Sequence, residues 1–512
     1  MAISAKRVSE RLAGSEELAL LDVREQGVHY RGHPFYAVSC PLSRLELMVG
    51  DLVPRLDVPV VVLDGGSERL ADKALEKLNQ LGYKDVSVLE GGCRGWKEAG
   101  LELFSGVNVP SKAFGEFVEH HYQTPRIPPE ELKELLDDKR KLVILDSRPF
   151  EEYRRMNIPG SVDVPGAELA WRVHDLAPEP DTLVVVNCAG RTRSIIGCQS
   201  LRNAGIPNQV VALKDGTMGW DLAGFDCERG AGRVAPPPTP DGREKALRAA
   251  ERVAVRFDVK FIDAKTLEQW RHDPARTLYI LDVRTRDEFE RSHVAGARHA
   301  PGGQLVQASD EYVGVRNARV VLVDWELVRA VMTASWLNQM GWDDVHVLQD
   351  FTGVAFESGA RAKPPVKQWE TTRDVEGATV LDLSTSLRFH YSHLPGAWWG
   401  VRSRLSEAAR RIGSVSSLVL TSEDGTLAHL AAAEAAEHFP QADIKVLEGG
   451  NAAWTGETES GVERATTERD DVWYKPYDHA QDYKKFAREY LEWEVALVEQ
   501  IKRDPTVRFR SY

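Results

Sequence analysis

Short apolar runs that stop at a polar residue recur along the chain, and each predicts a buried β-strand. The first run of each unit reads LALLD, LVILD, LYILD or TVLD, and these runs end at Asp22, Asp146, Asp282 and Asp382. A second run follows, and in the first three units it ends 42 residues further on, at Asp64, Cys188 and Asp324. A spacing that occurs three times predicts an internal repeat.

A third landmark closes each unit after another short apolar run. It ends at Trp96, Trp220, Phe356 and Trp454. Helical patterns that end in Gly separate the second and third runs, most clearly at 70–82 and 193–205. Strand, helix and strand at this spacing predict parallel crossovers. We therefore expect an α/β fold in which helices cover both faces of small, mostly parallel sheets.

The repeat divides the chain into four tandem units and a tail. We predict the units at 1–107, 124–230, 255–362 and 368–460, with a helical tail over 461–512. The tail carries apolar residues at steps of three and four, at Tyr483, Phe486, Tyr490, Trp493, Leu497 and Ile501. This stripe predicts a helix docked on a neighbouring domain or subunit, so a homodimer is one expectation.

Two junctions have the composition of linkers. The segment 110–131 separates the first two units, and the proline-rich segment 227–244 separates the second and third. Because proline-rich linkers act as spacers, the second junction predicts that the two halves of the chain fold independently.

Composition narrows the functional classes. The 512 residues include 65 Lys and Arg against 78 Asp and Glu, a net charge of −13. No overall positive field attracts nucleic acid or anionic lipid. We find no apolar run of 18 residues and no signal-peptide core, so we expect a cytoplasmic protein without a membrane partner. Five cysteines without a CxxC pair give neither a disulfide scaffold nor a zinc site, and we expect no metal and no cofactor.

Several motifs keep a fixed order within the units. The third unit has the fullest set, D-x-R, E-F and H-x-x-G-A, formed by Asp282, Arg284, Glu288, Phe289, His293, Gly296 and Ala297. With the loop before a helix and the closing Gly and Trp, this order resembles the rhodanese family of sulfurtransferases. The resemblance covers about residues 15–460 and implies four tandem rhodanese-like domains. The second unit has Asn157 in place of the His, and the fourth has Ser384 in place of the Arg.

Most of these motif residues have a structural interpretation. His33, His293 and His393 occupy one repeat position, which favours a shared hydrogen bond over catalysis. The D-x-R pair is expected to tie a strand end to neighbouring loops. In the second unit this pair, Asp146 and Arg148, is also a candidate to support the loop from behind.

Only the second unit has a cysteine at the loop position, Cys188. The first and third units have Asp64 and Asp324 there, and the fourth offers Thr421, Ser422 or Asp424. A carboxylate cannot carry a sulfane sulfur, so we expect three silent domains. Cys40 and Cys93 lie outside any motif, Cys198 falls on the apolar side of a helix, and Cys227 remains an alternative second thiol.

The position of Cys188 predicts a reactive thiolate. It ends a buried parallel strand directly before a helix, where loop amides and the helix N-terminus form an anion site. The loop residues Ala189, Gly190, Arg191, Thr192 and Arg193 are the candidate substrate-binding residues. The two arginines and the amides favour thiolate over thiol, and they are suited to hold the sulfonate of thiosulfate.

The resemblance implies a sulfurtransferase that works through a persulfide on Cys188. The donor is expected to be thiosulfate or a related small anion, and the acceptor a thiol or cyanide. Arg191 stands where the family's common C-x-x-G-x-R loop has Gly, which leaves the donor open. One alternative is a carrier that takes sulfur from a protein partner and passes it on. Another is a phosphatase or arsenate reductase, which the four residues between Cys188 and Arg193 disfavour.

Overall fold

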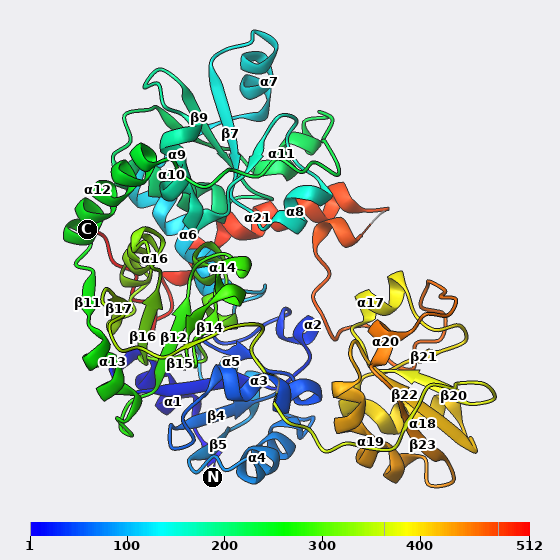
Figure 1. The fold of residues 1–512 in the computed structure, drawn as a ribbon. Coiled ribbons are helices and arrows are strands. Elements are labelled where there is room, and N and C mark those ends of the chain that lie inside the picture. Colours follow the sequence, from blue (N-terminus) through cyan, green and yellow to red (C-terminus); the bar gives the residue numbers. More distant parts are fainter. Residues whose placement is uncertain (1, 363, 480) are drawn as a thin grey trace.

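The computed structural model describes residues 2–362, 364–479 and 481–512. Residues 1 and 480, which belong to the predicted first unit and tail, lie outside that part, as does residue 363. The described chain contains four sheets built from parallel strands in one repeated order (Figure 1). In each of these sheets the strand that begins the unit lies at one edge and pairs with the strand of the third apolar run. The strand of the second run comes next, followed by the strand of the first run. Four repeated α/β units are therefore confirmed.

The second unit carries the candidate loop and illustrates the repeat. Its sheet has the order β6-β10-β9-β7-β8, and helices cover both faces. Its elements are β6 Arg126–Ile127, α7 Pro129–Asp137, β7 Leu142–Asp146, α8 Phe150–Arg155, β8 Val162–Asp163, α9 Leu169–Leu176, β9 Leu183–Asn187, α10 Thr192–Ala204, β10 Val210–Leu213 and α11 Gly216–Leu222. The helix expected after the second apolar run is α10, which ends before Gly205 in the left-handed conformation.

The first and third units repeat this arrangement. The first contains β1 Ala2–Ile3, α1 Ala5–Ala13, β2 Leu18–Asp22, α2 Gln26–His29, β3 Val38–Ser39, α3 Leu45–Leu52, β4 Val60–Leu63, α4 Leu70–Gln80, β5 Val86–Leu89 and α5 Gly92–Glu98. The third contains β11 Lys260–Ile262, α13 Ala264–Arg271, β12 Leu278–Asp282, α14 Arg286–Arg291, β13 His293–Val294, β14 Arg298–His299, α15 Gly302–Gln307, β15 Val315–Arg316, β16 Arg319–Val323, α16 Val328–Gln339, β17 Val345–Leu348 and β18 Phe356–Glu357.

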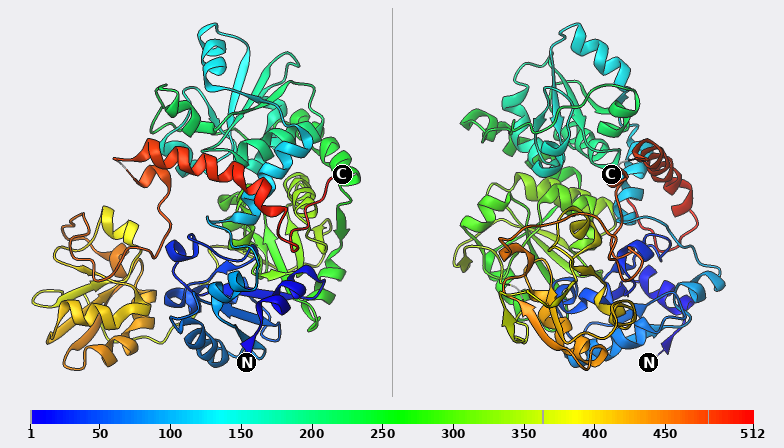
Figure 2. Two further views of the ribbon diagram at one scale, coloured as in Figure 1. Left: turned by 180° about the vertical axis from the view of Figure 1, so that it is seen from behind. Right: turned by 90° about the vertical axis from the view of Figure 1, so that its right-hand side faces the viewer.

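The fourth unit stands to one side of the other three (Figures 1 and 2). It contains β19 Thr371–Thr372, β20 Thr379–Asp382, α17 Ser386–Tyr391, β21 Trp398–Trp399, α18 Leu405–Ile412, β22 Ser417–Thr421, α19 Thr426–His438, β23 Asp443–Leu447 and α20 Gly450–Ala453. Ion pairs join it to the first unit, including Lys77 with Glu434 at 2.8 Å and Arg402 with Glu46 at 2.9 Å. This contact is largely polar, whereas the first three units share one apolar core.

The first predicted linker is instead a buried helix, α6 (Val109–Tyr122). Phe114 and Glu116 on this helix are at most 1% exposed, and α6 packs against α10 of the second unit. The linker prediction was wrong because polar residues of this segment, which would face water in a linker, pair with buried partners described below. One of them is Glu116.

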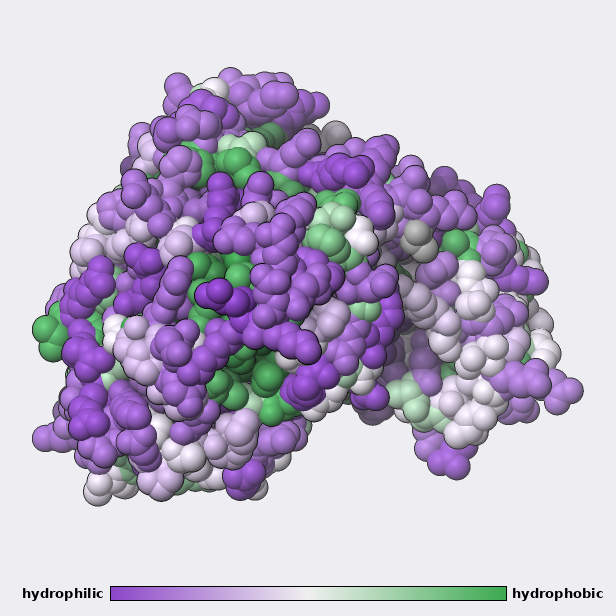
Figure 3. Space-filling model, turned by 90° about the horizontal axis from the view of Figure 1, so that it is seen from above, coloured by the Kyte–Doolittle hydropathy of each residue, from purple (hydrophilic) through white to green (hydrophobic). Residues whose placement is uncertain are grey.

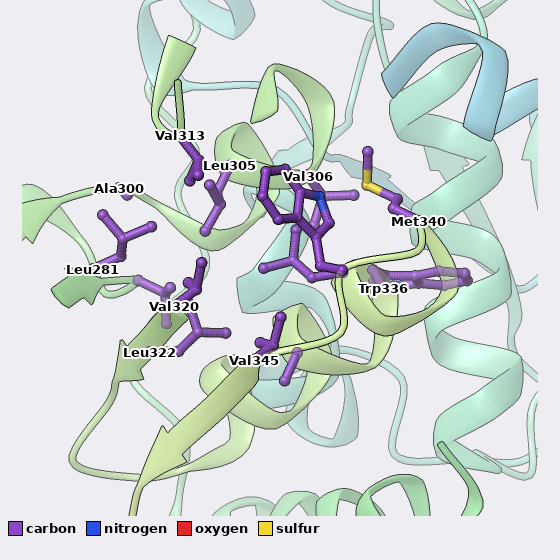
Figure 4. Close-up of a cluster of buried hydrophobic side chains, with 14 of the residues drawn as sticks. Leu281, Ala300, Leu305, Val306, Val313, Val320, Leu322, Trp336, Met340 and Val345 are labelled. Carbon is purple, nitrogen blue, oxygen red and sulfur yellow. The ribbon is translucent and has the colours of Figure 1, made fainter. Parts of the chain in front are cut away.

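The prediction of two independent halves was also wrong. Strand β15 of the third unit pairs antiparallel with β2 of the first and extends that sheet. Helix α12 (Pro240–Arg256), which begins within the proline-rich junction, packs on α9 and α16. Figure 4 shows Leu281, Leu322 and Trp336 in the third-unit core, and the Trp336 indole donates to Ser200 of α10 at 2.8 Å.

The tail helix α21 (Tyr483–Ile501) runs along α6 beneath the second unit (Figures 1 and 2). Leu497 is fully buried with Phe35 and Phe104 of the first unit, and the Trp493 indole donates to the Ser105 carbonyl at 3.0 Å. The prediction that the stripe docks on a neighbouring domain is therefore confirmed, and the docking site is within the same chain.

The outer surface is mostly polar on the face in Figure 3, with apolar side chains in small separate patches. Within the described ranges, no helix has the length and apolar character required to cross a bilayer.

Candidate active site

Cys188 directly follows β9 and precedes α10, as predicted from the sequence. Its side chain is only 2% exposed. The Sγ atom lies 3.5 Å from the Ser194 hydroxyl, which donates to the Arg191 carbonyl at 2.8 Å. The thiol therefore sits at the bottom of the loop, beside the first turn of α10.

The loop between β10 and α11 holds the Cys188 backbone in place. The Thr217 amide donates to the Cys188 carbonyl at 2.8 Å, and the Met218 amide donates to the Ala189 carbonyl at 2.9 Å. Gly216 has a φ of +56°, and a Cβ atom there would lie 2.4 Å from the Cys188 carbonyl oxygen. Only glycine permits this approach, so the closing Gly of the repeat has a direct role in supporting the loop.

Asp146 and Arg148, the candidate supporting pair, lie next to the residue that precedes Cys188. Arg148 donates to the Asp146 carboxylate at 2.8 and 2.7 Å and to the Met156 carbonyl at 2.7 Å. The Asn187 amide donates to Asp146 at 2.9 Å and to the Thr217 hydroxyl at 3.0 Å. The D-x-R pair thus fixes the residue that precedes Cys188.

The other three domains show which loop amides are available to an acceptor. In the first domain the Asp64 carboxylate accepts from the amides of Gly66 at 2.7 Å and Ala71 at 3.1 Å. In the third, Asp324 accepts from the amides of Glu326 at 3.2 Å and Arg329 at 2.8 Å.

The fourth domain resolves the alternatives left by its sequence. The Ser422 hydroxyl accepts from the Ala428 amide at 3.2 Å, and the Ser422 carbonyl accepts from the Asn451 amide as Cys188 does from Thr217. Ser422 is therefore the counterpart of Cys188. In all three of these domains an oxygen of the loop-position side chain accepts from loop or helix amides, which is the environment of an anion site.

Arg191 is committed to carboxylates on neighbouring elements. Its Nε and Nη2 atoms each donate to Glu116 of α6 at 2.7 Å, and it also pairs with Glu119 and with Asp215. The side chain is buried. The predicted contact of this guanidinium with a sulfonate remains a prediction, and the structure gives Arg191 a second role in joining the loop to α6.

Arg193 and Thr192 are also engaged. Arg193 donates to Glu152 of α8 at 2.8 and 3.2 Å and to the Gln304 amide oxygen at 3.4 Å. The Thr192 hydroxyl donates to Glu494 of the tail helix at 3.2 Å. The loop is thus tied to the third unit and to the tail as well as to its own domain.

Cys188 opens onto a cavity of about 210 Å³, here called the chamber. Its walls come from the second-unit loop, from Gln26 of the first unit, from Gln304 and Glu311 of the third, and from the tail. The tail contributes Trp473, Lys475, Pro476, Tyr477 and Tyr490. Sequence reasoning missed these wall residues. The aromatic stripe was the single signal for Tyr490, and no motif marked Lys475.

The remaining cysteines are poor nucleophiles. Burial raises the pKa of Cys40, Cys93 and Cys198 to about 12, and it raises the pKa of Cys227 to about 11. A thiolate is required for attack on sulfur, so burial disfavours nucleophilic attack by these four thiols at neutral pH. Cys198 is fully buried, as its position on the apolar side of α10 predicted.

The repeated histidines have structural hydrogen bonds, but only His293 and His393 share the same one, to a carbonyl four residues earlier. The Nδ1 atom of His293 lies 2.8 Å from the Phe289 carbonyl, and that of His393 lies 2.6 Å from the Phe389 carbonyl. His33 contacts the carbonyls of Pro34 and Gly106 at 2.8 and 3.1 Å.

Comparison with known families agrees with the repeated fold. The profile of the family described as "Rhodanese-like domain" matches residues 4–99, 128–223 and 263–351. These segments span more than half of the chain, so the protein belongs to the family of rhodanese-like domain proteins. The fourth unit, which has the same sheet order, lies outside the matched segments.

Individual relatives resemble one unit at a time. The chain is 34% identical over 91 residues to the HTH-type transcriptional regulator Rv0324 of Mycobacterium tuberculosis, covering 18% of this chain and 39% of that protein. It is 31% identical over 102 residues to the putative sulfur carrier protein YrkF of Bacillus subtilis, covering 20% of this chain and 54% of that protein. The chain thus spans about half or less of the length of these curated relatives.

One solved structure is similar along the whole chain. It is the crystal structure of a thiosulfate sulfurtransferase from Pseudomonas aeruginosa, which is 45% identical, with a TM-score of 0.95 and 99% of each chain covered. The arrangement of four units and tail is therefore shared with that protein.

Proposed function

We propose that the protein is a sulfurtransferase that moves a sulfane sulfur from thiosulfate, or a related small anion, to a thiol or cyanide through a persulfide on Cys188. The single observation that carries this proposal is the identity of the side chain at the loop position of each domain. Three domains place an oxygen among the loop amides, and the second domain places a thiol at that point. The same amides suit the anionic end of a persulfide.

The reaction divides into two displacements. The Cys188 thiolate attacks the outer sulfur of thiosulfate, the S–S bond of the donor breaks, and sulfite leaves with the bonding electron pair. The acceptor then attacks the outer sulfur of the persulfide, and the Cys188 thiolate is released. With cyanide as acceptor, the product is thiocyanate. Neither step requires a metal ion, a cofactor or a net proton transfer. Because the thiol must stay reduced, we place the reaction in the cytoplasm.

The burial of the Cys188 thiol favours a small sulfur donor over a protein donor. Cys188 is 2% exposed and lines a chamber of about 210 Å³, which has room for an ion of the size of thiosulfate. A protein donor would have to displace the tail before its sulfur could reach Sγ. The similarity to the Pseudomonas aeruginosa thiosulfate sulfurtransferase supports the same class of donor.

Two measurements test the proposal. The first is a steady-state assay with thiosulfate and cyanide, and the second is mass spectrometry of the protein after incubation with thiosulfate in the absence of cyanide. We expect thiocyanate and sulfite as products, and a mass increase of one sulfur on the peptide that contains Cys188. Cys188→Ser should abolish both signals. Cys227→Ser is the matched control from the same domain and should retain them. Turnover by Cys188→Ser would overturn the proposal.

Two other outcomes would redirect it. Labelling of Cys188 only in the presence of a protein persulfide donor would favour the carrier function. Release of phosphate from an aryl phosphate, or reduction of arsenate, by the wild-type protein and not by Cys188→Ser would favour the phosphatase or reductase.

A further inference from the structure

The chamber contains four cationic side chains, and three of them are already paired with carboxylates. Lys112 pairs with Glu494 at 3.1 Å. Arg191 pairs with three carboxylates and Arg193 with Glu152, as described above. The fourth is Lys475 of the tail. Among the described residues, no carboxylate lies within ion-pair distance of its Nζ atom.

Lys475 is held at the wall of the chamber by its neighbours in sequence. Arg155 of α8 pairs with Asp478 at 3.3 Å, and its guanidinium lies 4.5 Å from the centre of the Tyr477 ring. On the other side, the Trp473 amide donates to Gln26 of the first unit at 3.0 Å. The segment 473–478 therefore bridges the first two units across the chamber, and Lys475 lies in the middle of that bridge.

The side chain is charged and accessible. Burial works to lower the pKa of Lys475, but Tyr477 and Glu152 outweigh it, and the pKa is raised above its ordinary value. The residue is nevertheless exposed, because it lies between the chamber and a second cavity of about 560 Å³. A lysine ammonium that lines the same chamber as Cys188, and that has further donors beyond its contact with Tyr477, is suited to bind an anion.

We propose that Lys475 of the tail forms the anion subsite of the chamber and binds the sulfonate end of the sulfur donor. This inference rests on the proposed sulfurtransferase function. It assigns donor selection to a residue outside the four repeated domains, while the paired arginines of the loop shape and support the site. The same contact holds the departing sulfite, whose charge grows as the donor S–S bond breaks.

Two readouts test this subsite. The first is the KM for thiosulfate. The lysine ammonium donates a charge-assisted hydrogen bond to the sulfonate, so Lys475→Gln should raise the KM about tenfold or more. The second is the ratio of the rates at which iodoacetate and iodoacetamide alkylate Cys188, followed by mass spectrometry. The two reagents need the same thiolate, but only iodoacetate is an anion. A general change in reactivity therefore cancels in the ratio.

We expect the ratio to fall in Lys475→Gln by about the same factor as the KM rises, and to be retained in Lys475→Arg, which keeps the charge. Lys485→Gln is the matched control, because Lys485 lies in the same tail with its side chain 68% exposed and away from the chamber. An unchanged ratio in Lys475→Gln would overturn the subsite.

The outcome separates the two proposals. If the wild-type protein fails to use thiosulfate while the ratio still falls in Lys475→Gln, the donor assignment fails and the anion subsite stands. If the wild-type protein uses thiosulfate and Lys475→Gln changes neither readout, the sulfurtransferase function stands and the subsite is wrong.

Discussion

Arg191 and Glu116 form a buried ion pair in which both donors of one guanidinium edge meet both carboxylate oxygens at 2.7 Å. Arg191 belongs to the loop of Cys188, and Glu116 belongs to α6, a helix outside the repeated domains. The pair joins the candidate active site to the centre of the molecule. It also explains why an arginine occupies the loop position where the family commonly has glycine.

Arg191→Gln should therefore lower stability. The change leaves Glu116 buried without its cation, and breaking a buried ion pair costs about 3–5 kcal/mol. Urea unfolding should show a lower midpoint for this variant. Arg202→Gln, at an exposed position on α10, the helix that follows the loop, is the control and should unfold like the wild type. Equal midpoints for Arg191→Gln and the wild type would show that the pair adds nothing.

Gly216→Ala should reduce activity by displacing Cys188. The new Cβ atom would lie 2.4 Å from the Cys188 carbonyl oxygen, so the loop must shift. A displacement of about 1 Å in an active site costs about a hundredfold in rate. We expect a fall of that order in kcat/KM with thiosulfate. Gly224→Ala is the control, since Gly224 also has a positive φ, +87°, but no atom lies within 4 Å of its added Cβ. A similar loss in both variants would attribute the effect to backbone strain alone.

Asp163 should make stability depend on pH. Burial and the nearby Asp146 raise the pKa of Asp163 to about 8, and its Oδ1 atom is buried with no hydrogen-bond partner among the described residues. The native state keeps this proton up to about pH 8, whereas the unfolded chain loses it near pH 4. The unfolding free energy therefore falls by up to about 1.4 kcal/mol for each pH unit between these values.

Asp163→Asn removes the titration and should flatten this slope, so the variant gains stability over the wild type as the pH rises. Urea unfolding at pH 5 and pH 7.5 measures the difference. Asp138→Asn, exposed in the same domain, should follow the wild-type slope. Parallel slopes for the wild type and Asp163→Asn would contradict a raised pKa.

The sequence predicted the parts of the fold that depend on local pattern. Apolar runs ending at Asp146 and Cys188, and the closing Gly216 and Trp220, defined the repeated unit and the position of the thiol. Each of these signals lies within one domain. The repeated motif offered Asp146 and Arg148 as candidates to support the loop, and the structure links Asp146 to the loop through Asn187.

The rest depends on contacts between distant segments. Lys475 lies 287 positions after Cys188 in the chain and yet lines the same chamber. Its contribution arises from the docking of the tail on α6 and α8, which no local pattern encodes. Likewise, the polar residues of α6 indicated a linker in sequence, because their buried partners lie in other segments. Arg191 looked like an uncommitted cation for the same reason.

The contact between Glu494 and the loop should keep the tail closed over Cys188. Glu494 is fully buried, and its Oε1 atom accepts from Lys112 at 3.1 Å, from the Tyr490 hydroxyl at 2.8 Å and from the Thr192 hydroxyl at 3.2 Å. Glu494→Ala leaves these donors without an acceptor and costs about 3 kcal/mol or more. The docked state of the tail is destabilised by that amount relative to the detached state, so the tail detaches from the loop more often.

A thiol reagent too large for the chamber of about 210 Å³, such as a maleimide coupled to a long polyethylene glycol, reports this detachment, because it reaches Cys188 only when the tail is undocked. We expect the rate of modification to rise about tenfold or more in Glu494→Ala, because the fraction of opened molecules grows with the lost docking energy. Glu492→Ala, exposed on the same helix, should leave the rate unchanged. A wild-type rate in Glu494→Ala would mean that the apolar contacts of Leu497 and Trp493 alone hold the helix.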